Sequence, residues 1–253
     1  MKIGLVQYSP EWENKVENQK KITSLLMDFV KEGIDLLIFP EMSLTGFTMH
    51  GEKFSEQLSG ESFQYFSKIA RKFSIHILAG IIELENKNFF NTLLHIGRDG
   101  NILKTYRKIH PFSLSSEDKH YNKGKYAVVT EIDDWKVGLS ICYDLRFPEL
   151  YRLYAKEKVD LIVISANWPD TRIEHWKTLL KARAIENQCF VAGVNRVGDD
   201  PKLFYPGYSA VIDPMGSEII SSINEEILIC NISRKMVSDV RNKLPFLNDI
   251  TLI

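Results

Sequence analysis

The sequence predicts an α/β protein made of two similar halves. Strand-like apolar runs alternate with amphipathic helical stretches along the chain, a pattern typical of α/β folds. The run IDLLIF at 34–39 is echoed by VDLIVI at 159–164, and such continuous runs suit strands buried on both faces. The echo predicts two α/β halves that face each other across a pseudo-twofold axis. Since no linker rich in Gly, Ser or Pro separates the halves, we expect one domain over 1–253.

The first half is expected to contain two helices and a series of strands. The stretch 11–31 has apolar residues at helical spacing, namely Trp12, Val16, Ile22, Leu25, Leu26, Phe29 and Val30. The stretch 62–73 is a second amphipathic helix, whose apolar side is formed by Phe63, Phe66, Ile69, Ala70 and Phe73. The expected strands are 2–7, 34–39 (ended by Pro40), 75–83, 89–96 and 101–106, the last entered through an Asp99-Gly100 turn.

The second half repeats this plan and ends in a tail of mixed pattern. Strands are expected at 126–132, 135–141, 159–164, 189–195, 207–213 and 217–232, with the turn DPMG at 213–216. Helices are expected at 147–157 and 173–187. We expect the tail, 233–253, to pack against a neighbouring subunit.

Composition and charge exclude several classes of function. Lys and Arg number 32 and Asp and Glu number 33, so a net charge of −1 leaves no electrostatic reason to expect a nucleic acid or an anionic membrane as partner. No apolar run approaches the roughly 20 residues needed to span a bilayer. The chain opens MKIGLVQYSP, which reads as a strand rather than a secretory leader. We therefore expect a cytoplasmic protein.

The cysteines and histidines show no metal-binding or disulfide pattern. The three cysteines, which are Cys142, Cys189 and Cys230, are too few and too irregularly spaced for a disulfide framework or a zinc site. Cys189 and Cys230 lie in apolar strands and are expected to pack in the core. The histidines around the candidate site, His110, His120 and His175, form no spaced ligand set. We expect neither a metal nor a cofactor.

Three reactive side chains stand where predicted strands end, which is where α/β folds collect binding sites. Glu41 follows 34–39, Lys108 ends a strand in YRKIH, and Cys142 leaves the apolar strand 137–141 ahead of a helix. Taken singly, each has an ordinary alternative: a solvated glutamate, a solvated lysine and a small buried thiol. The turn at Cys142 resembles a nucleophile elbow, in which a helix N-terminus lowers the pKa of the thiol.

Together the three side chains supply what thiol chemistry on an amide requires. Cys142 would be the nucleophile, and Glu41 would take its proton and return it to the leaving ammonia. Lys108, kept charged beside a carboxylate, would stabilise the tetrahedral oxyanion together with the backbone N–H of Tyr143. No histidine is needed for this scheme, although spacing along the chain does not itself bring the three groups together.

These residues and the motifs around them resemble the nitrilase superfamily of carbon–nitrogen hydrolases over nearly the whole chain. The motifs occur in the family's order: LLIFPEMSLTGF (36–47), TYRKIHPF (105–112), SICYDLRFPEL (140–150), SANWP (165–169) and HWKTLLKARAIENQ (175–188). The resemblance implies a four-layer α-β-β-α sandwich that dimerises through helices. It also implies Glu41 as base, Lys108 as oxyanion stabiliser and Cys142 as nucleophile. A second glutamate, matched here by Glu117 in SSEDKHY, would orient the lysine and the substrate.

Within the superfamily the chain looks most like the omega-amidases, which deamidate 2-oxoglutaramate and 2-oxosuccinamate. Tyr143-Asp144, RFP at 146–148, NWP at 167–169 and His175-Trp176 support this branch. A nitrilase typically has Cys-Trp-Glu where this chain has Cys-Tyr-Asp, so nitrile hydrolysis is the weaker alternative. N-carbamoyl amines and deaminated glutathione are alternative amide substrates. A non-catalytic scaffold of the same fold is the alternative from a different class.

A small half-amide of a dicarboxylic acid needs a cation for its free carboxylate, and the planar guanidinium of arginine suits that group. The candidate substrate-binding residues are Tyr143, Arg146, Trp168 and Arg172. Arg146 has an alternative as a structural partner of Asp144 or Glu149. Trp168 is expected to wall the pocket, with a place in the core as its alternative.

Overall fold

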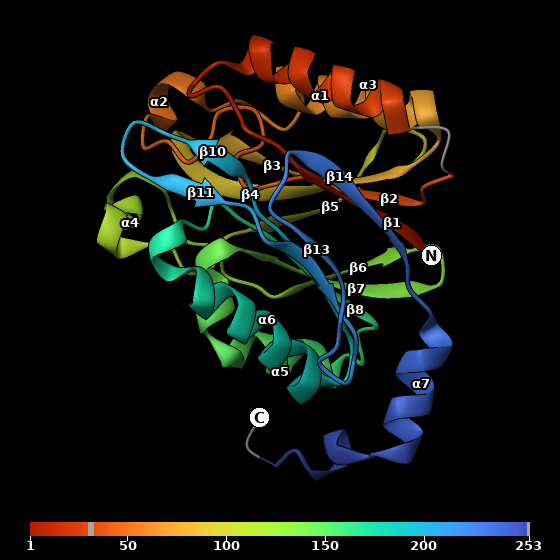
Figure 1. Cartoon of the computed structure of the whole chain (residues 1–253). Helices are drawn as coiled ribbons and strands as arrows, with labels where there is room; N and C mark the ends of the chain where they lie inside the picture. The colour runs from red at the N-terminus through yellow and green to blue at the C-terminus, as the bar shows by residue number, and fades with distance from the viewer. Residues whose placement is uncertain (30–32, 252–253) are drawn as a thin grey trace.

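Four layers make up the fold, seen in a computed structural model that describes residues 1–29 and 33–251. Two six-stranded sheets pack face to face in the middle (Figure 1). Helices α1 (Lys15–Phe29) and α3 (Glu61–Phe73) cover the first sheet, and α5 (Pro148–Lys156) and α6 (Ile173–Asn187) cover the second. The predicted α/β class is confirmed, and so is the α-β-β-α sandwich implied by the family resemblance.

Each sheet has its own strand order. The first sheet runs β14-β1-β2-β3-β4-β5 and the second runs β13-β12-β9-β8-β7-β6. The first contains β1 (Lys2–Gln7), β2 (Leu36–Ile38), β3 (His76–Glu85), β4 (Asn88–Ile96), β5 (Ile102–Arg107) and β14 (Glu226–Asn231). The second contains β6 (Val128–Ile132), β7 (Trp135–Ile141), β8 (Leu161–Ser165), β9 (Phe190–Val194), β12 (Ser209–Ile212) and β13 (Glu218–Ser222). A separate hairpin pairs β10 (Val197–Asp199) with β11 (Phe204–Pro206).

The two sheets repeat one topology. In the first, the parallel strands β1, β2 and β3 are followed by antiparallel β4 and β5. In the second, the parallel strands β7, β8 and β9 are followed by antiparallel β12 and β13. The echoing runs 34–39 and 159–164 therefore supply the matching middle strands β2 and β8.

Apolar side chains fill the interfaces between the layers. One core lies between the sheets and beneath α5 and α6, with members such as Leu78, Val163 and Trp176. A second core joins the first sheet to α1 and α3 through residues such as Ile22, Phe66 and Ile77. Strands in the middle of such a sandwich are covered on both faces, which explains why β2 and β8 are continuously apolar.

Helix α1 begins at Lys15, so the prediction that it begins at residue 11 is wrong. The Asn14 side chain accepts a hydrogen bond from the backbone N–H of Glu17 (3.1 Å), a contact typical of the residue that caps a helix N-terminus. Trp12 consequently lies ahead of the helix, where it lines the pocket described below. Residues 30 and 31 of the predicted helix lie outside the described residues.

The predicted strand 217–232 is in fact two strands that belong to different sheets. β13 pairs in the second sheet and β14 in the first, so residues 223–225 cross between them. The Gln7 amide holds this crossing by donating to the backbone oxygens of Ser222 (3.0 Å) and Asn224 (2.7 Å). The crossing falls in the polar stretch SSINEE at 221–226, which the prediction of one continuous strand passed over. Sequence reasoning also missed the β10–β11 hairpin and the short helices α2 (Gly51–Phe54) and α4 (Glu117–His120).

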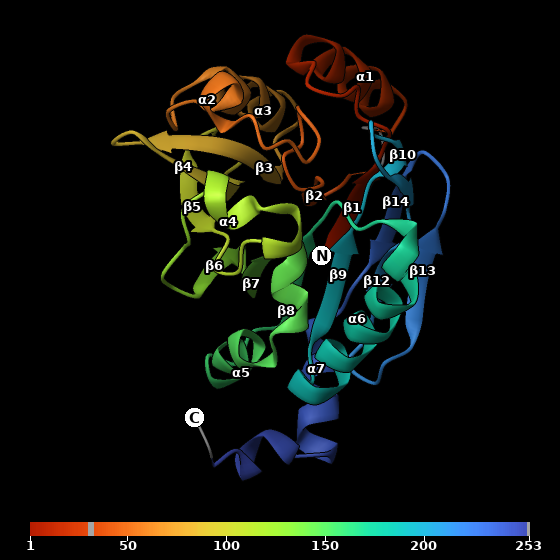
Figure 2. The ribbon, with the colours of Figure 1, turned by 90° about the vertical axis from the view of Figure 1, so that its left-hand side faces the viewer.

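The C-terminal tail forms helix α7 (Arg234–Lys243) and a 3-10 turn at Phe246–Asp249, beyond α5 and α6 (Figure 2). Arg241 anchors the tail by donating to the backbone oxygens of Lys158 (3.3 Å), Val159 (2.6 Å) and Gln188 (3.0 Å). The packing of this tail against a neighbouring subunit stays a prediction. Among the described helices, none has the length and apolar character that crossing a membrane requires.

Candidate active site

Glu41 lies in a buried turn that follows β2 and rests directly on β3. A Cβ atom at Gly80 would come within 2.5 Å of the Met42 nitrogen and 3.0 Å of the Glu41 backbone, so only glycine lets the turn approach this closely. The Ser43 hydroxyl fastens the two segments, because it accepts from the Gly80 N–H (3.0 Å) and donates to the Pro40 carbonyl (2.6 Å). The Glu41 carboxylate is thereby held at the end of the sheet.

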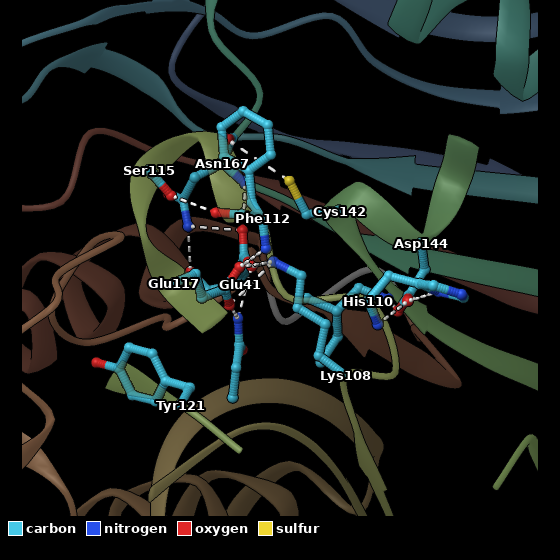
Figure 3. Close-up of polar contacts among 12 residues, drawn as sticks. Glu41, Lys108, His110, Phe112, Ser115, Glu117, Tyr121, Cys142, Asp144 and Asn167 are labelled. Carbon is cyan, nitrogen blue, oxygen red and sulfur yellow. Dashed lines mark hydrogen bonds and ion pairs between the residues drawn. The ribbon is translucent and has the colours of Figure 1, made fainter. Parts of the chain in front are cut away.

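Lys108 follows the last residue of β5 and is fixed by the neighbouring strand. Its backbone N–H donates to the carbonyl of Asn91 on β4 (2.9 Å). Its ammonium Nζ donates to Glu41 Oε1 (2.7 Å) and to Glu117 Oε1 (3.1 Å) and Oε2 (2.8 Å). Figure 3 shows the three charged groups meeting in one cluster, and each is at most 1% exposed.

The two carboxylates keep the Lys108 ammonium charged. Burial alone would lower the pKa of Lys108, but the charges of Glu117 and Glu41 outweigh burial and raise it, so the ammonium stays charged at neutral pH. Burial raises the pKa of Glu117, Lys108 lowers it and Glu41 raises it again, with a net upward shift. Glu117 Oε2 also accepts from the backbone N–H of Phe112 (2.6 Å). Lys108 is therefore oriented by two carboxylates on either side of it.

Cys142 sits at a sharp turn between a strand and a helix. β7 ends at Ile141, and Cys142 itself has a φ of +46°, a strained left-handed conformation of the kind found at active sites. A five-residue 3-10 helix, Cys142–Arg146, leads from there into α5. The thiol faces the carbonyl of Asn167, at an Sγ···O distance of 3.7 Å (Figure 3).

The predicted lowering of the thiol pKa is wrong. Burial, followed by the negative charge of Glu41, raises the pKa of the Cys142 thiol well above its ordinary value, and the opposing effect of Lys108 is smaller. A 3-10 helix of five residues supplies a weak dipole, whereas taking a thiolate out of water is costly. Cys142 therefore rests as a protonated thiol and needs a base before it can attack.

Asp144 ties the Cys142 turn to the segment that carries Lys108. Its carboxylate accepts hydrogen bonds from the Tyr106 hydroxyl (2.7 Å), the His110 backbone N–H (3.0 Å) and the Ile141 N–H (3.0 Å). The His110 ring nitrogen Nδ1 lies 2.8 Å from the same carboxylate. Tyr106 and His110 bracket Lys108 in the chain, so this buried carboxylate fixes the nucleophile relative to the lysine.

A pocket of about 580 Å³ opens above Cys142. Its lining is mainly apolar and comes from six loops, with Trp12, Phe47, Met49, Phe112, Leu114, Tyr143, Trp168, Pro169, Pro201, Leu203 and Tyr205 as the apolar and aromatic members. Arg146, Arg172 and Lys202 add positive charge to the lining. Asp200 also lines it, but its carboxylate is already bound by the Tyr205 hydroxyl (2.6 Å) and by the Lys202 and Leu203 N–H groups.

Both candidate arginines line this pocket, and within the described chain neither has an acidic partner. Arg146 stacks on the Trp168 ring at 4.7 Å and lies 3.2 Å from Nδ1 of His175. Its alternative pairing with Asp144 or Glu149 is wrong, because no ion pair joins the described Arg146 side chain to either carboxylate, and Asp144 accepts from other donors. The Arg172 guanidinium lies over the Phe112 ring at 5.4 Å and donates to the neighbouring hydroxyl of Thr171 (3.3 Å).

The other two candidate substrate-binding residues also lie at the pocket. Trp168 is 2% exposed and donates its indole N–H to the Arg172 carbonyl (2.8 Å), so it shapes the wall and holds the arginine backbone. The Tyr143 ring packs at 4.8 Å from that of Phe112 and lines the same space. Whether either residue touches substrate stays a prediction.

Sequence reasoning missed two asparagines that bind the Glu41 carboxylate. Asn167, after β8, donates its backbone N–H to Glu41 Oε2 (3.1 Å) and its side-chain amide to the Glu41 carbonyl (2.7 Å). Asn91, on β4, donates its side-chain amide to Glu41 Oε1 (2.7 Å) and Glu117 Oε1 (2.9 Å). The signal for Asn167 was its place after β8, the counterpart of β2. For Asn91 the signal was the polar pair Asn91-Thr92 inside the otherwise apolar run FFNTLL.

No group of three or more His, Cys, Asp or Glu side chains is arranged to hold a metal ion in the part of the chain that the structure describes. The cationic member of the cluster is Lys108, and the chemistry of this site can be written with the chain's own groups. The expectation that the site works without a metal or cofactor stays a prediction.

Comparisons with known proteins agree with this geometry. The family model of carbon-nitrogen hydrolases matches residues 2–242. A 2-oxoglutaramate amidase of Bacillus subtilis is 35% identical over 98% of this chain and 96% of its own length. An omega-amidase of Mus musculus is 32% identical over 92% of this chain and 89% of its own. A Xanthomonas campestris structure, described as a CN-hydrolase superfamily protein with an arsenic adduct in the active site, has a TM-score of 0.94 at 32% identity, covering 100% of this chain and 98% of that one.

Proposed function

Because this chain belongs to the carbon-nitrogen hydrolase family and is an amidase of the nitrilase superfamily, we propose that it acts on small amides that carry a free carboxylate. The proposed substrates are 2-oxoglutaramate and 2-oxosuccinamate, which would be hydrolysed to the acid and ammonia. The observation that carries this proposal is the pocket above Cys142, where two arginines stand without an acidic partner. An arginine fork binds a carboxylate well in such a partly enclosed site.

The proposed reaction begins with the protonated thiol of Cys142. Glu41 takes the thiol proton as Sγ attacks the amide carbon, and the carbonyl oxygen becomes an oxyanion. Lys108 and the backbone N–H of Tyr143 stabilise this oxyanion. The longest contact of Lys108 Nζ, 3.1 Å to Glu117 Oε1, is the one that the oxyanion would replace. A preorganised donor of this kind is worth about 3 kcal/mol of transition-state stabilisation.

Collapse of the tetrahedral intermediate breaks the carbon–nitrogen bond. Glu41 returns its proton to the nitrogen, which leaves as ammonia, and the acyl group stays on Cys142 as a thioester. Glu41 then takes a proton from an entering water molecule, whose oxygen attacks the thioester carbon. The C–S bond breaks, the acid leaves, and Glu41 returns the proton to Sγ of Cys142. Every proton that moves in this scheme passes through Glu41.

A second candidate is a larger amide such as deaminated glutathione. The volume of the pocket, about 580 Å³, exceeds what a five-carbon keto acid fills, and two arginines suit a substrate with two carboxylates. The ratio of kcat/KM values for 2-oxoglutaramate, deaminated glutathione and an N-carbamoyl amine separates these candidates.

The main test measures ammonia and 2-oxoglutarate released from 2-oxoglutaramate. Wild type should release both, and Cys142→Ala should release neither. Arg146→Met and Arg172→Met should raise KM for 2-oxoglutaramate by about tenfold or more and leave a neutral amide such as butyramide unaffected. Equal inactivity of wild type and Cys142→Ala on all these amides would refute the assignment. A scaffold without activity would also leave Cys142 no more reactive toward iodoacetamide than Cys189 and Cys230.

The oligomeric state and the cellular location are also part of the proposal. We propose a homodimer, in keeping with the family resemblance and the exposed faces of α5 and α6, which sedimentation would test. We also propose a reducing, cytoplasmic location, because Cys142, Cys189 and Cys230 are all free thiols.

A further inference from the structure

We propose that Asn91 is a positioning residue that selects Oε2 of Glu41 as the oxygen that receives the thiol proton. This inference rests on the proposed roles of Glu41 and Cys142. Asn91 lies on β4, is 1% exposed and reaches two of the charged groups at once. Its Nδ2 donates to Glu41 Oε1 (2.7 Å) and to Glu117 Oε1 (2.9 Å).

The two oxygens of Glu41 have different surroundings. Oε1 accepts two short hydrogen bonds, one from Lys108 Nζ (2.7 Å) and one from Asn91 Nδ2 (2.7 Å). A carboxylate oxygen offers about two lone-pair directions, so Oε1 has none left for an incoming proton. Oε2 accepts the backbone N–H of Asn167 at 3.1 Å and a long contact from the Asn167 amide at 3.4 Å. Both contacts of Oε2 are longer than those of Oε1, so Oε2 is the more weakly held oxygen and can exchange the long Asn167 amide contact for the thiol proton.

The thiol lies on the side of Oε2. Cys142 Sγ is 3.7 Å from the carbonyl of Asn167, and the backbone N–H of the same residue contacts Oε2. In the first step the S–H bond breaks, its proton goes to Oε2, and a bond forms between Sγ and the amide carbon. In the second step the proton leaves Oε2 for the nitrogen, which departs as ammonia. Throughout both steps, Asn91 and Lys108 keep their hydrogen bonds to Oε1.

The orientation of the Asn91 amide supports a positioning role over a purely structural one. Its Oδ1 is buried and has no hydrogen-bond partner in the described structure. A buried acceptor without a protein partner costs stability. Turning the amide over would place Oδ1 against Glu41 and Glu117, which are both acceptors. The two carboxylates thus fix the orientation of the Asn91 amide, and its Oδ1 is left without a hydrogen bond as a result.

The same residue also fixes the lysine. The Lys108 backbone N–H donates to the Asn91 carbonyl (2.9 Å), so one residue sets the position of the lysine backbone and of both carboxylates. The adjacent Thr92 offers a matched control. Its hydroxyl donates to Glu83 (2.7 Å), a carboxylate outside the cluster, and it is equally buried on β4.

The test compares Asn91→Ala and Asn91→Ser with Thr92→Val. Two profiles are recorded against pH for each: kcat/KM on 2-oxoglutaramate, and the rate at which iodoacetamide alkylates Cys142, mapped by mass spectrometry. Removing the Asn91 donor that holds Oε1 should move the acid limb of both profiles upward by about one pH unit. For Asn91→Ala, kcat should fall at least about tenfold while KM changes less than about threefold. Thr92→Val should leave both limbs in place.

Two results would overturn the inference. Unshifted limbs in folded Asn91→Ala and Asn91→Ser would show that Asn91 does not act on Glu41, and so would equal shifts in Thr92→Val. Should Asn91→Ala not fold, the Asn91→Ser profiles decide alone. If wild type leaves 2-oxoglutaramate intact, the proposed substrate is wrong, yet the alkylation profiles still decide whether Asn91 governs proton transfer from Cys142.

Discussion

Acid should destabilise this protein through a pair of buried histidines that join the two sheets. His76 Nδ1 on β3 lies 2.9 Å from His95 Nε2 on β4, and His95 Nδ1 lies 2.7 Å from the hydroxyl of Thr130 on β6. Burial, with a smaller contribution from the His76 charge, lowers the pKa of His95 from 6.5 to about 3. Burial, and then Arg98, lowers the pKa of His76, while carboxylates of Asp133, Asp35 and Asp99 partly oppose this.

The sign follows from the proton count. Below pH 6.5 His95 is protonated in the unfolded chain, whereas in the folded chain it stays neutral down to about pH 3. The free energy of unfolding therefore falls as the pH falls from 6.5 to about 3. Integrated from pH 7.5 to 4.5, His95 alone should remove about 3 kcal/mol from the free energy of unfolding. His76 adds to the loss in the same direction.

The assay is urea denaturation at pH 7.5, 6.0 and 4.5, followed by tryptophan fluorescence. His95→Gln removes the titrating ring, so its free energy of unfolding should fall by about 3 kcal/mol less than that of wild type over this range. The exposed His120 supplies the control, since His120→Gln should reproduce the wild-type slope. Parallel slopes for wild type and His95→Gln would refute the reasoning.

Three substitutions test how the fold positions the site. Gly80→Ala places a Cβ against the Met42 nitrogen and should lower kcat by about tenfold or more with the fold retained. Gly97→Ala is the control: its Cβ would meet only movable side chains, so kcat should stay unchanged. Asp144→Ala removes the carboxylate that Tyr106, His110 and Ile141 contact, and should cost about 3 kcal/mol in urea denaturation and at least about tenfold in kcat; a stability loss without any change in kcat would contradict its linking role. Arg241→Met frees the tail and should cost about 2 kcal/mol by the same assay with kcat intact, so a parallel loss of kcat would show that the tail supports the site.

The layers of the fold were predictable because a strand that is buried on both faces has a continuously apolar sequence. The apolar runs at 34–39 and 159–164 became the middle strands of the two sheets. The division of 217–232 had a signal in the polar stretch SSINEE at 221–226, but the crossing between sheets is held by Gln7, which lies far away in the chain. The start of α1 was signalled by Asn14, but the apolar Trp12 extended the helical pattern past it.

The candidate site was predictable where a residue's place in the chain carries the chemistry. Glu41, Lys108 and Cys142 each follow a strand, and strands of one sandwich end together. The environment of these residues was less accessible to sequence reasoning. The thiol pKa depends on how much water reaches Cys142, which is a property of the assembled pocket. Asn91 stood inside a strand, where side chains alternate, and only the packed sheets show which neighbours it meets.

The contact between Glu41 and Asn167 joins residues 126 positions apart and comes from the two middle strands of different sheets. A chain that is refolding can collapse each half, and even bury its tryptophans, before this contact exists. The recovery of amidase activity, measured as ammonia release, would then report when the two halves dock in register. The delay between the recovery of fluorescence and the recovery of activity in the same sample would then measure the rate of the last long-range step of folding.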